Sequence, residues 1–213
     1  MSRTGVRPPH QPSRLTFDYR LSEDVALAGE AWAHHIERWN VTVAGESGTP
    51  VGYVHVIILN LDGDVEVADL ADATSGEWRE PVVHDLARRT VGTRGPVGIN
   101  PSVGVLGAHV LVLDRVFIEP EFRGSGLGPI VAALVLGRLQ RGCHFAVCFP
   151  APFDGPRGEE ERDRSVVALG RVWATVGFRA RPDGVWVLDL QDDTLRLATE
   201  RLLDPGPDST APG

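Results

Sequence analysis

The sequence contains no lysine, so all 21 of its basic residues are arginine. A P-loop for nucleoside triphosphates needs a lysine that reaches the β- and γ-phosphates. That class of nucleotide site is therefore excluded. The 29 acidic residues give a formal net charge of −8, whereas proteins that bind nucleic acids usually present a basic face. The charge balance therefore predicts that nucleic acid is not a partner.

Cysteines and long apolar runs are also scarce. The only two cysteines, Cys143 and Cys148, lie in one apolar segment, where buried free thiols are expected rather than a disulfide framework or a metal site. No run of about 18 apolar residues suggests a membrane span, and the first thirty residues lack the apolar core of a signal peptide. We therefore expect a cytoplasmic protein with no membrane partner and no metal.

The chain length and the order of apolar patterns predict one domain with a mixed sheet. The 213 residues are typical of a single domain. We place it at residues 15–203, with disordered tails at 1–14 and 204–213. The expected strands and helices alternate at the centre and pair as hairpins elsewhere, which favours an α/β (α+β) fold with helices against a mixed sheet. Strands are expected over 15–21, 51–61, 109–118, 144–149 and 184–190, with a hairpin across 40–61, and helices over 129–141, 165–176 and 191–203.

Three parts of the chain have less definite patterns. Residues 25–38 can continue as a helix, but the stretch 35–43 fits a strand equally well. The acidic run 62–72 is typical of a solvated face, and a helix is expected to follow it up to about residue 89. Residues 91–107 are rich in glycine and proline, and we expect a functional loop there.

The most informative pattern lies within residues 113–142. An apolar strand leads through Glu119-Pro120 into the loop 123–128, which has the sequence RGSGLG and precedes a long apolar helix. Loops of this kind bring backbone N–H groups together at a helix N-terminus, where they bind anions. A dinucleotide-binding loop needs G-x-G-x-x-G, but the sixth positions are Pro129 and Val131, so that motif is absent.

What remains resembles a motif of one enzyme superfamily. Residues 116–128, VFIEPEFRGSGLG, resemble motif A of the GNAT superfamily of acyl-CoA-dependent N-acyltransferases. Residues 172–178, VWATVGF, resemble the end of its motif B. Together these motifs and their surroundings cover about residues 109–190. The resemblance implies a twisted, mostly antiparallel sheet, and acetyl-CoA as co-substrate.

The resemblance also implies positions for the co-substrate. Pantetheine is an extended chain of amides that can pair with a strand edge, and the resemblance places it along Val116, Phe117 and Ile118. The pyrophosphate is expected on backbone N–H groups near the start of the helix, although Pro129 has none to offer. Arg123 is expected to support the loop. The remaining positions assigned to the co-substrate are Gly124, Ser125, Gly126, Leu127, Gly128 and Pro129.

The catalytic residues are less clearly marked. The resemblance implies an oxyanion donor among the backbone N–H groups near Phe117. The tyrosine that usually acts as the acid is replaced here by Trp173, which is a poor proton donor. Asp114 interrupts an apolar strand and is the candidate base; the alternative is that it pairs with an arginine or faces solvent.

Two further candidates share one face of a neighbouring strand. Tyr53 is the candidate substitute acid. His55 has a suitable ordinary pKa for proton transfer; the alternative is a packed or surface histidine.

Three functions follow from these observations. The first is an N-acetyltransferase that acts on a primary amine of a small molecule or peptide, by direct transfer in a ternary complex. The second is a non-catalytic acyl-CoA-binding module, which the substitution by Trp173 favours. The third is an interaction domain in which the glycine loop is a plain turn. A homodimer is compatible with each of them. The acceptor is not identified, although an acidic protein slightly favours a cationic one.

Overall fold

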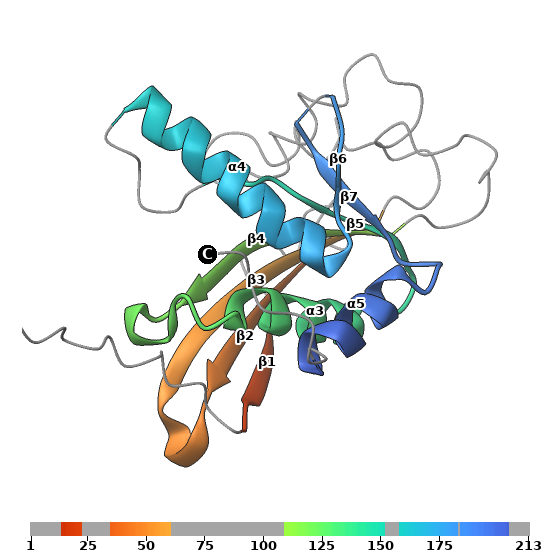
Figure 1. Cartoon of the computed structure of the whole chain (residues 1–213). Helices are drawn as coiled ribbons and strands as arrows, with labels where there is room; N and C mark the ends of the chain where they lie inside the picture. The colour runs from red at the N-terminus through yellow and green to blue at the C-terminus, as the bar shows by residue number, and fades with distance from the viewer. Residues whose placement is uncertain (1–13, 23–34, 61–108, 152–157, 183, 205–213) are drawn as a thin grey trace, which may run out of the picture.

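The computed structural model describes residues 14–22, 35–60, 109–151, 158–182 and 184–204. Within them, seven strands form one sheet in the order β1-β2-β3-β4-β5-β7-β6 (Figure 1). The strands are β1 Thr16–Ser22, β2 Ile36–Ala44, β3 Pro50–Asn60, β4 His109–Ile118, β5 Cys143–Cys148, β6 Arg179–Ala180 and β7 Trp186–Asp189. The helices are α3 Leu127–Leu139, α4 Glu159–Val176 and α5 Thr194–Leu203, with short 3-10 turns η2 Glu46–Gly48 and η5 Pro120–Phe122.

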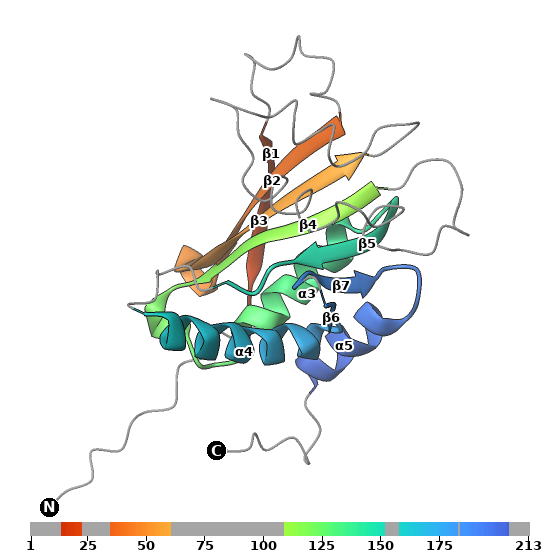
Figure 2. The same cartoon turned by 90° about the horizontal axis from the view of Figure 1, so that it is seen from above.

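The sheet is mixed and mostly antiparallel, which confirms the predicted fold class. Strands β1 to β4 pair with their neighbours antiparallel, as do β5 with β7 and β7 with β6. Only β4 and β5 are parallel, because α3 crosses over between them. The three helices lie on one face of the sheet (Figure 2). Within the described ranges no helix has both the length and the apolar character needed to cross a membrane.

The core lies between the sheet and α3. The helix is apolar around its whole circumference, which is typical of a helix buried on most sides. Its Val131 and Leu136 share a buried cluster with alternate residues of the central strands, among them Val54 and Leu111. The alternation follows from the period of two in a strand, which sends every second side chain to the same face. This packing holds the glycine loop before α3 at a defined position relative to β4.

Several local predictions are confirmed. The hairpin predicted across 40–61 is present, with β2 paired to β3 around the η2 turn. Residues 36–44 are a strand, so the strand interpretation of that stretch is correct. Strand β4 has the predicted bounds, His109–Ile118. The predictions for 25–34, 62–72, the helix up to about 89, the loop 91–107 and most of both tails lie outside the described residues.

Other boundaries differ from the prediction. Helix α3 begins at Leu127 rather than 129, because Gly126 adopts the left-handed conformation that ends the preceding turn. Helix α4 begins at Glu159 rather than 165, so it is longer at its N-terminus than predicted. Its first turn contains three glutamates, which the helix dipole stabilises at an N-terminus. Strand β6 was not predicted, since two exposed residues have no recognisable period.

Candidate active site

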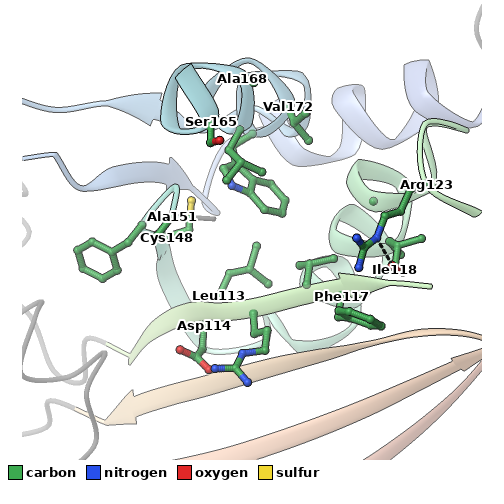
Figure 3. Close-up of a pocket in the computed structure, with 16 residues that line it drawn as sticks. Leu113, Asp114, Phe117, Ile118, Arg123, Cys148, Ala151, Ser165, Ala168 and Val172 are labelled. Carbon is green, nitrogen blue, oxygen red and sulfur yellow. Dashed lines mark hydrogen bonds between the residues drawn. The ribbon is translucent and has the colours of Figure 1, made fainter. Parts of the chain in front are cut away.

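Strands β4 and β5 diverge halfway along β4, where their pairing ends. Their parallel pairing extends only from His109 to Leu113 on β4, and β5 ends at Cys148. Strand β4 continues to Ile118 with β3 on one side and no strand on the other among the described residues. A cavity of about 450 Å³ occupies this opening (Figure 3). All residues of β4 from Leu113 to Ile118 line it.

Helix α4 forms the opposite wall of the cavity. Its lining residues recur at helical spacing and so lie on one face: Ser165, Ala168, Leu169, Val172 and Trp173. The ring of Trp173 also packs edge-on against the buried Phe178, at 6.3 Å between ring centroids. Trp173 therefore faces the cavity from a fixed position, and its indole N–H can donate a hydrogen bond but cannot usefully act as an acid.

The main-chain groups of β4 alternate between β3 and the cavity. The Glu119 N–H donates to the Val51 carbonyl oxygen at 2.9 Å. Hydrogen-bonded pairs alternate in an antiparallel ladder, so the next such pair is Phe117 with Tyr53. Val116 and Ile118 consequently direct their N–H and C=O groups toward the edge that β5 leaves open. An extended amide chain can pair with that edge.

The glycine loop lies at the end of this edge. Gly124 and Gly126 have φ angles of 76° and 79°, in the left-handed region that favours glycine. A Cβ on either would meet no protein atom within 4 Å, so both backbones border open space. Ser125 closes the turn through a hydrogen bond from its Oγ to the Phe122 carbonyl oxygen at 2.5 Å. Gly128, in the first turn of α3, lines the cavity.

Asp114 occupies a β-bulge. His55 of β3 is paired with Arg115, but the next residue, Val56, is paired with Leu113, so Asp114 is the extra residue of β4. Both Asp114 and Arg115 border the cavity, as does every residue of β4 from Leu113 to Ile118. Asp114 and Phe117 lie on the side of β4 turned away from α4 (Figure 3).

The environment shifts the pKa values of two groups beside the bulge. The side chain of Asp114 is open to solvent on one side, yet the protein around it raises its pKa through desolvation, against the lowering effects of Arg115 and His55. The pKa of His55 is lowered, mainly by desolvation; the charge of Asp114 opposes this shift and that of Arg115 adds to it. A carboxylate with a raised pKa is a better proton acceptor than an ordinary one.

Tyr53 and His55 lie beside the cavity but do not line it. The Tyr53 ring stacks on Phe117 at 5.0 Å between centroids and lies 4.9 Å from the His55 ring. Of these three residues only Phe117 lines the cavity. Tyr53 and His55 thus lie near the predicted base Asp114, on the neighbouring strand β3 and outside the cavity lining.

Cys148 is a lining residue that the sequence did not single out as part of a site. Its side chain is 2% exposed, and burial raises the pKa of the thiol far above its ordinary value. The thiol therefore stays protonated at neutral pH, which makes it a poor nucleophile. Among the described residues no three metal-ligating side chains cluster.

Apart from Trp173, the residues of the α4 wall were also missed as part of the site. The signal was present as small and apolar residues three and four positions apart from residue 165 onward. That spacing does not distinguish a cavity wall from a packed core face.

No protein-family model and no curated protein matches the sequence. Several solved structures are similar to it. AtaT complexed with acetyl-methionyl-tRNAfMet is 9% identical, with 86% of this chain and 99% of that chain covered and a TM-score of 0.44. AtaTR bound with AcCoA is 10% identical, with 86% and 96% covered and a TM-score of 0.39. Arylalkylamine N-acetyltransferase 2 from Aedes aegypti is 13% identical over 70% of each chain, with a TM-score of 0.38.

With TM-scores below 0.5, these similarities carry no argument about the activity, acceptor or partners of this chain. The absence of a nucleic-acid partner stays a prediction from the charge balance.

Proposed function

We propose that the protein is an acyl-CoA-dependent N-acyltransferase that moves an acetyl group from acetyl-CoA to a primary amine. The observation that carries this proposal is the separation of β4 from β5. It leaves the main-chain groups of Val116 and the N–H of Ile118 facing a cavity, while the Ile118 carbonyl oxygen accepts from Arg123. The same edge leads to the glycine loop before α3. An edge that pairs amides next to a loop that binds phosphates suits the pantetheine and pyrophosphate parts of coenzyme A.

The glycine loop fits the phosphate end. The N–H groups of Leu127 and Gly128 belong to the first turn of α3, where helix N–H groups have no partner within the helix. The open space in front of Gly124 and Gly126 is where the phosphate oxygens would lie. Side chains in that space would hold the backbone away from those oxygens. The thioester would then lie toward the other end of the edge, near Asp114.

The chemistry follows from the groups at that end. Asp114 accepts a proton from the acceptor's ammonium group, which frees the amine lone pair. The amine attacks the thioester carbonyl carbon, and backbone N–H groups of the open edge stabilise the oxyanion. The new C–N bond forms and the C–S bond breaks. The nitrogen then gives its surplus proton to water, and the thiolate takes one from water, since Trp173 supplies none. Cys148 is protonated and buried, so direct transfer is favoured over an acyl-enzyme.

A second function, a non-catalytic acyl-CoA-binding module, is favoured by one observation. Trp173 lines the cavity at the position where the resemblance implies a tyrosine acid. Without an acid for the leaving thiolate, the site could hold acyl-CoA without turning it over. Release of free thiol from acetyl-CoA, measured against a broad panel of primary amines, separates the two functions. Turnover supports the transferase, and binding without turnover on any amine supports the module.

Binding is tested by calorimetric titration with acetyl-CoA and CoA, using a matched pair of glycine variants. Gly128→Asp places a carboxylate in the first turn of α3, where it suits the helix dipole but repels phosphates. Gly137→Asp adds the same charge to the exposed part of the same helix. We expect micromolar binding by the wild type and by Gly137→Asp, and none by Gly128→Asp. Absence of binding by the wild-type protein would refute the proposed function.

A further inference from the structure

Strand β1 forms one edge of the sheet (Figure 1). It pairs with β2 along its whole length, and among the described residues no strand lies on its other side. Edge strands are commonly kept from pairing with another chain by being very short, or by a proline or a bulge. The opposite edge, β6, is only two residues long. Strand β1 has seven residues, no proline and no break in register, so its outer main-chain groups can pair with a further strand.

The charges of β1 are self-complementary. Asp18 and Arg20 lie on either side of Tyr19, and both are exposed. Charged side chains usually protect an edge strand. If two copies of β1 pair antiparallel about Tyr19, however, Asp18 of each copy lies directly opposite Arg20 of the other. A shift of two residues in either direction would place two aspartates or two arginines opposite one another, which is destabilising.

The other face of β1 carries a matching apolar row, which consists of Phe17, Tyr19 and Leu21. Phe17 and Tyr19 are paired with Val43 and Val41 of the buried core cluster, so the row continues the core toward the edge. The first two side chains of the row are half-buried, and Leu21 is 43% exposed. In the pairing about Tyr19, Phe17 of one copy lies opposite Leu21 of the other. Each copy therefore removes apolar surface of the other from water.

From these observations we infer that the protein forms a symmetric homodimer, in which two β1 strands pair antiparallel about Tyr19 and join the two sheets into one. Such an interface is isologous, so each residue pair occurs twice. Within one copy Asp18 and Arg20 form an ion pair of 2.8 Å, but an exposed pair contributes little by itself. In the dimer the four charges form one network. Strands β2 and β3 separate this interface from β4, so the inference does not depend on the proposed function.

The main experiment reverses the two charges. Asp18→Arg and Arg20→Asp each place like charges opposite one another in a homodimer, so each variant alone should dimerise about tenfold more weakly than the wild type, or less. An equimolar mixture of the two variants again places opposite charges across the interface and should recover the dimer. The double variant Asp18→Arg/Arg20→Asp should recover it without mixing. Sedimentation equilibrium over a concentration series measures each Kd, and circular dichroism checks that each variant is folded.

The control for net charge is Asp163→Arg, at an exposed position of α4. It makes the same substitution away from β1 and should leave the Kd of the dimer unchanged. The affinity for acetyl-CoA should be the same in the charge-reversal variants of β1 as in the wild type, because β1 does not line the cavity.

A cross-link tests the position of the two-fold axis. Residues directly opposite in an antiparallel pair have Cα atoms about 4.5–5.5 Å apart, within the range of about 4.4–6.8 Å that a disulfide spans. Tyr19→Cys should therefore give a covalent dimer on mild oxidation. Thr42→Cys, exposed on the inner strand β2, should give none, and the native Cys143 and Cys148 are buried.

We expect a Kd in the micromolar range, the weak end for protein interfaces, because one strand edge supplies most of the contact. A wild-type protein that remains monomeric up to about a hundredfold above that concentration would overturn the inference. A dimer that is equally stable in both single variants would place the interface elsewhere and also overturn it. So would single variants that are weakened but recover neither by mixing nor in the double variant. Failure of the wild type to bind CoA would instead refute only the proposed function.

Discussion

The Nε of Arg123 donates a hydrogen bond of 2.8 Å to the carbonyl oxygen of Ile118. This bond joins the last residue of β4 to the loop that precedes α3, across the η5 turn. The guanidinium carbon also lies 5.1 Å from the centre of the Phe117 ring, within the range of a cation–π contact. The side chain of Arg123 therefore fixes the glycine loop relative to the open edge of β4.

The first prediction follows from this relationship. Arg123→Gln removes the charged donor and the contact with Phe117, so the loop and the edge are held together less firmly. We expect the affinity for acetyl-CoA to fall about fivefold to tenfold, in line with about 1 kcal/mol for an exposed hydrogen bond of this kind. Calorimetry measures the change, with Arg141→Gln, an exposed arginine after α3, as the control for net charge. Equal losses in both variants would contradict the prediction.

The second prediction concerns the position of α4. A Cβ at Gly170 would lie 2.7 Å from a ring atom of Trp186 on β7, whereas a Cβ at Gly137, on the exposed side of α3, would meet nothing within 4 Å. Gly170→Ala should therefore destabilise the fold by about 1–3 kcal/mol through overpacking. Gly137→Ala should stabilise it by about 0.5–1 kcal/mol, because alanine favours a helix interior.

Urea unfolding monitored by circular dichroism gives both values. Because α4 forms a wall of the cavity, Gly170→Ala should also weaken CoA binding, and Gly137→Ala should not. A Gly170→Ala variant as stable as the wild type would show that Trp186 moves aside without cost.

The third prediction concerns the raised pKa of Asp114. A raised pKa in the folded state means that ionisation of this carboxyl group opposes folding. This destabilisation of the fold is absent below the ordinary pKa of an aspartate and fully present above the pKa that Asp114 has in the folded protein. Asp114→Asn should therefore raise the melting temperature at pH 7, and the difference should shrink as the pH falls toward 4. Asp163→Asn makes the same substitution at an exposed position of α4 outside the cavity and serves as the control for the change in net charge.

The substitution Asp114→Asn should also nearly abolish turnover. Loss of a general base typically lowers kcat by about 10²- to 10⁴-fold. In the wild type, kcat/KM should fall on the acidic side with a midpoint above the ordinary aspartate pKa, and this limb should disappear in the residual activity of Asp114→Asn. Unaltered kcat in Asp114→Asn would assign the base to another residue, with His55 as the next candidate.

The fourth prediction concerns Cys148. Its buried, protonated thiol should not accept the acetyl group. Mass spectrometry of the protein after incubation with acetyl-CoA alone should show no acetyl adduct on this residue, and initial-rate plots for the two substrates should intersect. Stoichiometric acetylation of Cys148 before the acceptor is added would instead establish an acyl-enzyme route.

Much of the site's framework could be predicted from the sequence because it depends on neighbouring residues. The strand up to Ile118, the turn at Gly124 and Gly126 and the apolar helix after it are set by local preferences over some thirty residues. The hairpin of β2 and β3 was predictable for the same reason. Helix α4 was placed six residues too late, since its first turn is charged and has no apolar period.

The remaining features depend on contacts between distant parts of the chain. The order of residues placed Asp114 in a strand, but its role as the extra residue of a bulge is decided by the pairing of His55 with Arg115 and Val56 with Leu113. The divergence of β4 from β5 and the wall formed by α4 likewise join segments that are tens of residues apart.

The sequence by itself excluded the P-loop and the dinucleotide loop, and it located the glycine loop before α3, because those motifs are defined by residue type and spacing within one short stretch. Only the tertiary structure decided that the edge after Leu113 is open, that Trp173 faces it, and that Asp114 and Arg115 share one cavity. Strand pairing and helix packing produce these features, and neither is encoded at a fixed spacing in the chain.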